Sequence, residues 1–274
     1  MNSRLRVKKN FGSIFSRFRA QFKACMLERL SSRGAIAMMF TMNTLMLVMA
    51  YFFWNAFSSS SGDISGGFFT KDTLLTYTVV SVILRSLIVT FGVVWRVGGM
   101  ITDGSICGIS LKPVGFLEYW MFQQISRLIY SIFALTIPLV IFTFIFMPNL
   151  FSSNLHFVPF ILSSIIGFYI STLLNISMGL MGFWTEKTEA VHQLNMLLYT
   201  LASGTLVPLA IYPSFIRKIV GVLPYASIID TPLTILIKGD SSLIYIQLIW
   251  AVILTIGYSV LYKKGSKRLE VVGV

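Results

Sequence analysis

A glycine-rich segment, Gly99-Met-Ile-Thr-Asp-Gly104-Ser105, has the spacing with which a phosphate-binding loop begins. Such a loop needs a lysine directly after its second glycine and a strand before it, because backbone N–H groups and the lysine together hold the phosphates. Ser105 stands where the lysine is needed, and an apolar run precedes the segment. We therefore expect no nucleotide site, metal or other cofactor in this chain. Any ATP and magnesium would be bound by another subunit.

A second candidate for chemistry is the set Glu186, Glu189 and His192, which repeats every three residues. A carboxylate and a histidine at this spacing can share a metal, but a facing helix must supply a second such pair. The only other histidine, His156, lies at the far end of an apolar run. We interpret the set as the solvated start of a helix. No Ser-His-Asp or Cys-His set can gather on one side, which disfavours an intramembrane enzyme.

Arg85 is the one charged residue inside a long apolar run, and a charge at such a position is by default a functional candidate. Its partner could be a backbone carbonyl, water in a cavity, or the acid Asp230. Structural pairing and direct substrate contact both stay open. None of the ten acidic residues falls in a predicted span, whereas proton- and sodium-coupled carriers usually keep one there. This disfavours a secondary carrier.

The composition places these residues in a membrane. Hydrophobic residues make up 55% of the chain, charged residues only 12%, and the mean hydropathy is +0.80. A soluble domain carries about 25% charged residues. We predict an all-α polytopic membrane protein with six membrane-spanning helices. They fall at about 34–57, 73–95, 128–147, 157–184, 193–211 and 243–262, so that a transmembrane domain, 34–262, lies between two tails, 1–33 and 263–274.

Two segments are expected to touch the membrane without crossing it. In the N-terminal tail, apolar residues recur every three or four positions among basic ones, which predicts an amphipathic helix lying in the interface; a soluble helix packed on a partner is the alternative. These residues are Phe11, Phe15, Phe18, Phe22 and Cys25. Residues 212–241 hold two apolar pieces of about half the spanning length, separated by prolines. We predict a re-entrant hairpin there.

The basic residues orient the chain. Most of the 22 Lys and Arg residues lie on the side of both termini and of the loop 96–115. The positive-inside rule makes that side cytoplasmic. We therefore read the net charge of +12 as membrane orientation and not as a nucleic-acid surface. Cys25 and Cys107 would be free cytoplasmic thiols. We expect a multi-pass protein of a bacterial cell membrane, in contact with its lipids.

The loop 96–115 is the longest predicted cytoplasmic connection, and it is tied to two spans. We expect a short helix near 100–109 whose apolar residues are exposed and dock on a partner outside the membrane. Ile101 and Ile106 would seat in a cleft of that partner, with Asp103 at its rim. A turn packed on its own protein is the alternative. The candidate contact residues are Met100, Ile101, Asp103, Gly104, Ile106, Ile109 and Lys112.

Small residues recur every four positions in the fourth predicted span, which lets two helices approach closely in lipid. They are Ser163, Gly167, Ser171, Asn175 and Gly179. We expect packing within the chain, with a second copy as the alternative.

Taken in order, several motifs resemble those of the type-2 ATP-binding-cassette exporter permeases, in the short six-span branch. They are Ile101-x-x-Gly104 with Leu111-Lys112-Pro113, then Phe183-Trp184-Thr185-Glu186, Gly204-x-x-x-Pro208 and Leu223-Pro224. The resemblance implies that the loop 96–115 is the coupling helix, docked on one of two ATPase subunits. It implies pairing with a second copy or a sister permease, and a hairpin that closes the external end. It would make the chain the permease subunit of an ATP-driven exporter. A secondary carrier and a non-transporting scaffold or sensor remain the alternatives, and the substrate stays open.

Overall fold

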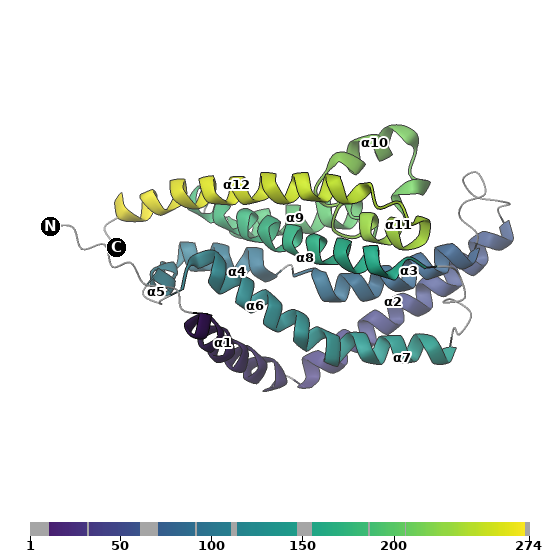
Figure 1. The fold of residues 1–274 in the computed structure, drawn as a ribbon, viewed down its shortest axis with the longest axis horizontal. Coiled ribbons are helices and arrows are strands. Elements are labelled where there is room, and N and C mark those ends of the chain that lie inside the picture. Colours follow the sequence, from purple (N-terminus) through teal and green to yellow (C-terminus); the bar gives the residue numbers. More distant parts are fainter. Residues whose placement is uncertain are drawn as a thin grey trace.

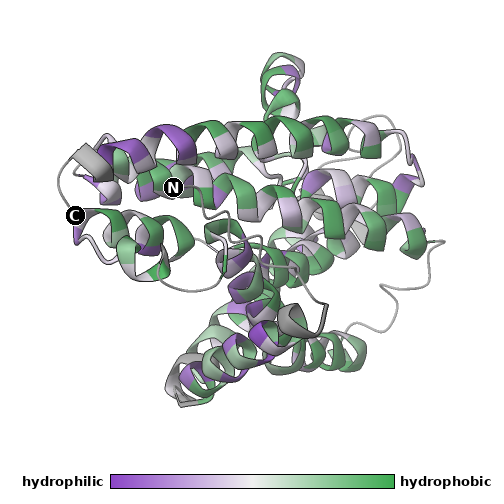
Figure 2. Ribbon diagram, turned by 60° about the vertical axis from the view of Figure 1, so that its left-hand side comes forward, coloured by the Kyte–Doolittle hydropathy of each residue, from purple (hydrophilic) through white to green (hydrophobic). Residues whose placement is uncertain are grey.

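The structure is a computed structural model that describes residues 11–31, 33–60, 71–90, 92–110, 114–146, 155–185, 187–205 and 207–271. Within these ranges the chain is helical and contains no strand. The long helices lie side by side along one direction (Figure 1). Hydrophobic residues dominate most of them (Figure 2). The all-α fold class is confirmed.

Five helical stretches among the described residues are long and apolar enough to cross a membrane. They are Ala37–Ala56, Thr73–Thr102, Phe116–Phe146, Phe157–Phe183 and Leu243–Arg268. The first lies in α2 (Arg33–Ser60) and the last in α12 (Leu243–Val271). The six-span count is not confirmed, because the helix at the fifth predicted span, α9 (Thr188–Ala202), has only 15 residues. Helix α9 ends before Gly204, whose φ of 76° is left-handed. The prediction that this span continues unbroken to residue 211 was therefore wrong.

The second span is a broken helix. Its first part, α3, covers Lys71–Ile88, and its second part, α4, covers Gly92–Thr102. The predicted end at residue 95 was wrong, because α4 continues for two more turns. A break leaves carbonyls unpaired, and hydrocarbon tolerates this only where protein satisfies them. Arg127 donates to the Leu87 carbonyl at 2.8 Å and Ser171 donates to the Ile88 carbonyl at 3.4 Å.

The third span is continuous with the segment before it. Helices α6 (Phe116–Ser131) and α7 (Ile137–Phe146) are joined by a π-helical turn, η1 (Ile132–Thr136). The segment 116–127, which precedes the predicted third span, is part of this long helix. The π-turn lies directly before Pro138, which has no N–H for the carbonyl of Ala134 and whose ring crowds the preceding turn. Such a wide turn is a known response of a helix to this crowding.

The fourth span, α8 (Phe157–Leu180), lies at the centre of the bundle and ends in a 3₁₀ turn, η3 (Met181–Phe183). All five of its small or amide residues at four-residue spacing are buried within the chain. Ser163 hydrogen-bonds Gln247 of α12 at 2.8 Å, and Asn175 accepts from Asn195 of α9 at 2.9 Å. The expected internal packing is confirmed.

Both tails contain helix. Helix α1 (Phe11–Ser31) packs on α6, with the rings of Phe18 and Phe122 5.4 Å apart and Cys25 only 2% exposed. Part of the apolar stripe therefore serves contact within the chain, whereas Phe15 is 69% exposed. Interfacial placement stays a prediction. The predicted C-terminal tail is helical as far as Val271, and Arg268 donates to the Phe183 carbonyl at 3.1 Å.

The predicted hairpin has both of its helical halves. A 3₁₀ turn, η4 (Leu209–Ile211), leads into α10 (Ser214–Val222), and α11 (Asp230–Lys238) follows. Helix α10 has no buried residue, whereas α11 packs against α8 and α3. Membrane re-entry stays a prediction.

Candidate functional site

The loop predicted to couple the chain to a partner is divided by a tight turn. Residues 96–102 belong to α4, and the short helix α5 (Ile106–Ser110) begins after Gly104, whose φ is 75°. The expected continuous helix near 100–109 is therefore split. Asp103 Oδ1 accepts the Ser105 N–H at 2.9 Å, and hydrogen bonding to the side chain and backbone of Ser105 lowers the pKa of Asp103. Lys112 lies outside the described residues.

The apolar side of this loop faces its own protein. Ile101 is 9% exposed, and Ile106 and Ile109 are each 3% exposed, in a cluster with the ends of α8 and α12. The expectation that Ile101 and Ile106 are exposed for docking was wrong. The physical reason is that the ends of α8 and α12 offer an apolar surface directly beneath the loop, and burying two such side chains there is worth about 1.5–3 kcal/mol each.

The exposed side of the loop is polar and small. Thr102, Asp103, Ser105 and Gly108 are exposed, while Met100 is partly buried. A side chain added at Gly108 would meet nothing within 4 Å. This edge is the part of the loop that a partner could touch.

The end of α4 packs very closely against α8 and α9. A Cβ atom on Gly98 would lie 2.6 Å from Cγ2 of Thr188, at the start of α9, and one on Gly179 would lie 2.6 Å from Cβ of Val97. On each glycine an added side chain would overlap the side chain opposite it, so α4 packs on α8 and α9 with almost no space between them.

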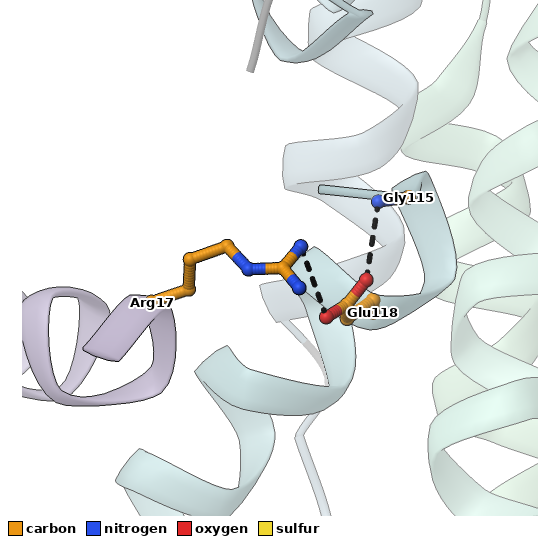
Figure 3. Close-up of polar contacts among 3 residues, drawn as sticks. All are labelled: Arg17, Gly115 and Glu118. Carbon is orange, nitrogen blue, oxygen red and sulfur yellow. Dashed lines mark hydrogen bonds and ion pairs between the residues drawn. The ribbon is translucent and has the colours of Figure 1, made fainter. Parts of the chain in front are cut away.

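Glu118 connects α1 to the start of α6, directly after the loop (Figure 3). One carboxylate oxygen accepts the Gly115 N–H at 3.4 Å and closes the first turn of α6. The other lies 3.5 Å from Nη1 of Arg17 on α1. Both side chains remain about one-fifth exposed. An ion pair at such a site contributes little energy, so its role is positional.

Arg85 lies beside a cavity of about 590 Å³ between α2, α3, α6 and the C-terminal end of α1. Its Nη1 contacts Sδ of Met46 at 3.6 Å. The carboxylate of Asp230, considered as a partner from the sequence, accepts instead from the Tyr77 hydroxyl at 2.8 Å and the Leu209 N–H at 3.2 Å. Tyr77 precedes Arg85 by two helical turns, about 12 Å along the axis. The structure thus places Arg85 beside a cavity, which is one of the surroundings considered from the sequence.

Two further arginines line the same cavity, Arg29 and Arg127. Arg127 directly precedes the third predicted span, yet it is only 8% exposed and holds the broken end of α3. Its position one turn after Gln123 and Gln124 was a sequence signal for a polar site on this helix. Sequence spacing could not bring Arg29, Arg85 and Arg127 together, because they lie on three different helices.

Residues 44–273 match a protein family described as ABC-2 family transporter protein. The chain belongs to the ABC-2 transporter family. Among proteins with curated descriptions, none matches it. With its five long apolar helices, this ABC-2 family chain is a multi-pass membrane protein with the character of a transport permease.

The matched region of the ABC-2 family chain includes the loop, Arg85 and Arg127, and it begins within α2. Helix α1, with Arg17 and Arg29, precedes that region. Of the set considered for metal binding, Glu189 accepts from Gln193 at 2.8 Å, and Glu186 lies outside the described residues. His156 packs against Gly239 at the end of α11. The described residues contain no group of three metal-ligand side chains.

Proposed function

We propose that this ABC-2 family chain is the membrane permease subunit of an ATP-driven exporter. In this proposal two separate ATPase subunits bind and hydrolyse ATP with magnesium, and a second copy or a sister permease completes the membrane domain. The substrate moves outward, and both termini and the loop 96–115 are cytoplasmic. The observation that carries the proposal is the family membership over residues 44–273.

The loop 96–115 is the proposed docking element. Its exposed edge, formed by Thr102, Asp103, Ser105 and Gly108, would contact the ATPase. The buried Ile101, Ile106 and Ile109 would serve as the anchor that transmits movement, because they pack on helices of the bundle. Met100, Gly104 and Lys112 remain candidate contact residues of this loop. This contact differs from the one expected from sequence. The exposed, mostly polar residues of the edge would touch the ATPase, and the isoleucine side chains would not.

The test is co-purification of an ATP-binding-cassette ATPase that is co-expressed with this chain. Gly108→Arg places a bulky side chain on the exposed edge, where a Cβ meets nothing within 4 Å. We expect it to remove the ATPase and transport-linked ATP hydrolysis without lowering thermal stability. Gly221→Arg, on exposed α10 and equally open, is the matched control and should retain both. Asp103→Ala should have a milder effect, because rim residues carry little binding energy.

Ile106→Asp separates docking from folding. Because Ile106 is 3% exposed, the aspartate would be buried without a partner and should lower thermal stability. Loss of the ATPase in this variant alone would therefore not support docking. If Gly108→Arg keeps the ATPase at the wild-type level, the exposed edge is not the coupling contact and the assignment fails.

A further inference from the structure

The cavity beside Arg85 has an unusual concentration of positive charge for a site within a membrane protein. Arg29, Arg85 and Arg127 all line it, and the described lining residues include no Asp or Glu. The three arginines come from α1, α3 and α6, so only the folded chain gathers them. Like charges around one low-dielectric cavity repel each other strongly, and an anion between them would relieve that repulsion.

Two of the three guanidinium groups, those of Arg29 and Arg127, hold a buried nitrogen without a hydrogen-bond partner among the described residues. Arg127 uses Nη2 for the Leu87 carbonyl, while its Nε is buried with no hydrogen-bond partner among the described residues. The Nε of Arg29 is in the same situation, and its guanidinium carbon lies 5.7 Å from the centre of the Tyr130 ring. A buried donor without an acceptor is costly. Both nitrogens belong to side chains that line one cavity, and neither has an acceptor among the described residues.

The neighbouring carboxylate is engaged elsewhere. Glu28 lies 3.2 Å from Nη2 of Arg96, which lines an adjacent cavity of about 350 Å³. Arg29 and Arg127 line both cavities, whereas Arg85 lines only the larger one. The larger cavity therefore keeps a net positive wall even with the Glu28–Arg96 pair in place.

The opposite wall of the larger cavity is apolar and faces outward. It is formed by methionines of α2, of which Met38, Met39 and Met42 are 64%, 51% and 57% exposed. The span of α2 is apolar and mostly unburied, so this wall faces lipid or a neighbouring chain. Methionine is flexible and polarizable, and it adapts to chains of variable shape. The cavity is thus lined by arginines on one part of its surface and by flexible, apolar methionines on another.

We propose that this cavity binds the phosphate head group of an anionic membrane amphiphile, which enters sideways between α2 and the bundle. Arg29 and Arg85 hold the phosphate, because a planar guanidinium matches phosphate oxygens, and Arg127 adds a third positive charge to the same cavity. The acyl chain of the amphiphile lies along the methionines of α2. The site requires neither the ATPase nor a transport direction, so it stands independently of the proposed function.

The test uses the purified full-length chain in detergent, stripped of lipid and titrated with phosphatidylglycerol or phosphatidylcholine. Native mass spectrometry counts the bound molecules. We expect the wild type to retain phosphatidylglycerol preferentially. Arg29→Gln and Arg85→Gln should each weaken this binding about tenfold, as expected for the loss of one charge-assisted hydrogen bond. Arg217→Gln, on exposed α10, is the control and should bind as the wild type does. Arg127 is left intact because it holds the helix break.

Three results would overturn the proposal. Equal retention of the two lipids would show that the phosphate charge is not recognised, since phosphatidylcholine carries a compensating cation. Unchanged phosphatidylglycerol binding in both variants, with unaltered thermal stability, would place the lipid elsewhere. Competition by inorganic phosphate at the same concentration as the lipid would assign the cavity to a soluble anion and remove the amphiphile. None of these outcomes depends on ATPase binding, so a failure here is distinguishable from a failure of the coupling assignment.

Discussion

Arg127 donates from Nη2 to the carbonyl oxygen of Leu87 at 2.8 Å, and so joins the middle of α6 to the broken end of α3. The contact explains how a membrane-spanning helix can be interrupted between residues 88 and 92. A carbonyl released from its helical partner would otherwise lie unpaired in an apolar environment. The same guanidinium forms part of the cationic cavity, so the helix break and the cavity share one residue.

Replacing Arg127 should therefore destabilise the fold. Arg127→Met keeps an extended side chain but removes every donor, so the Leu87 carbonyl loses its hydrogen bond from the guanidinium. We expect a loss of about 1.5–3 kcal/mol, the usual range for a hydrogen bond to a charged group. The measurement is the thermal midpoint in detergent. Arg217→Met is the matched control, since Arg217 makes an exposed bond to the Ala210 carbonyl. Equal midpoints for the two variants would contradict the role given to Arg127.

Gly204 should tolerate no side chain. Its φ is 76°, and a Cβ atom there would lie 2.7 Å from the hydroxyl of Tyr77 and 2.9 Å from Cβ of Asp230. Gly204→Ala should destabilise the chain by about 1–3 kcal/mol from backbone strain, with the clash added. Gly221→Ala, inside α10 and open on all sides, should be neutral or stabilising by up to about 1 kcal/mol. Thermal unfolding of both variants checks this, and a Gly204→Ala midpoint at or above that of wild type would count against it.

The orientation of the chain can be measured by thiol labelling. In a variant with Cys25 and Cys107 replaced by alanine, we expect cysteines placed at Ser105 and Ser266 to resist an impermeant thiol reagent in intact cells. A cysteine placed at Ser241 should react. The reason is that basic segments are retained on the cytoplasmic side during insertion. All three should react after permeabilisation, which controls for accessibility. Labelling of the Ser105 position in intact cells would reverse the orientation.

The sequence by itself determined the class of the molecule. Its apolar runs indicate membrane helices because only helices satisfy every backbone group within one segment. The four-residue spacing from Ser163 to Gly179 correctly indicated a closely packed helix face, since that spacing is a local property of a helix. The order of short motifs indicated the family that the match over residues 44–273 then showed.

Tertiary structure alone decided which apolar residues face protein and which face outward. Ile106 and Met42 are both apolar residues, yet one is 3% and the other 57% exposed. In a membrane protein hydropathy cannot separate them, because lipid and core favour the same side chains. The cavity has the same origin: Arg29, Arg85 and Arg127 meet through the packing of three helices and the break in one of them. The three arginines come together through contacts between residues far apart in the sequence, and local residue spacing does not predict such contacts.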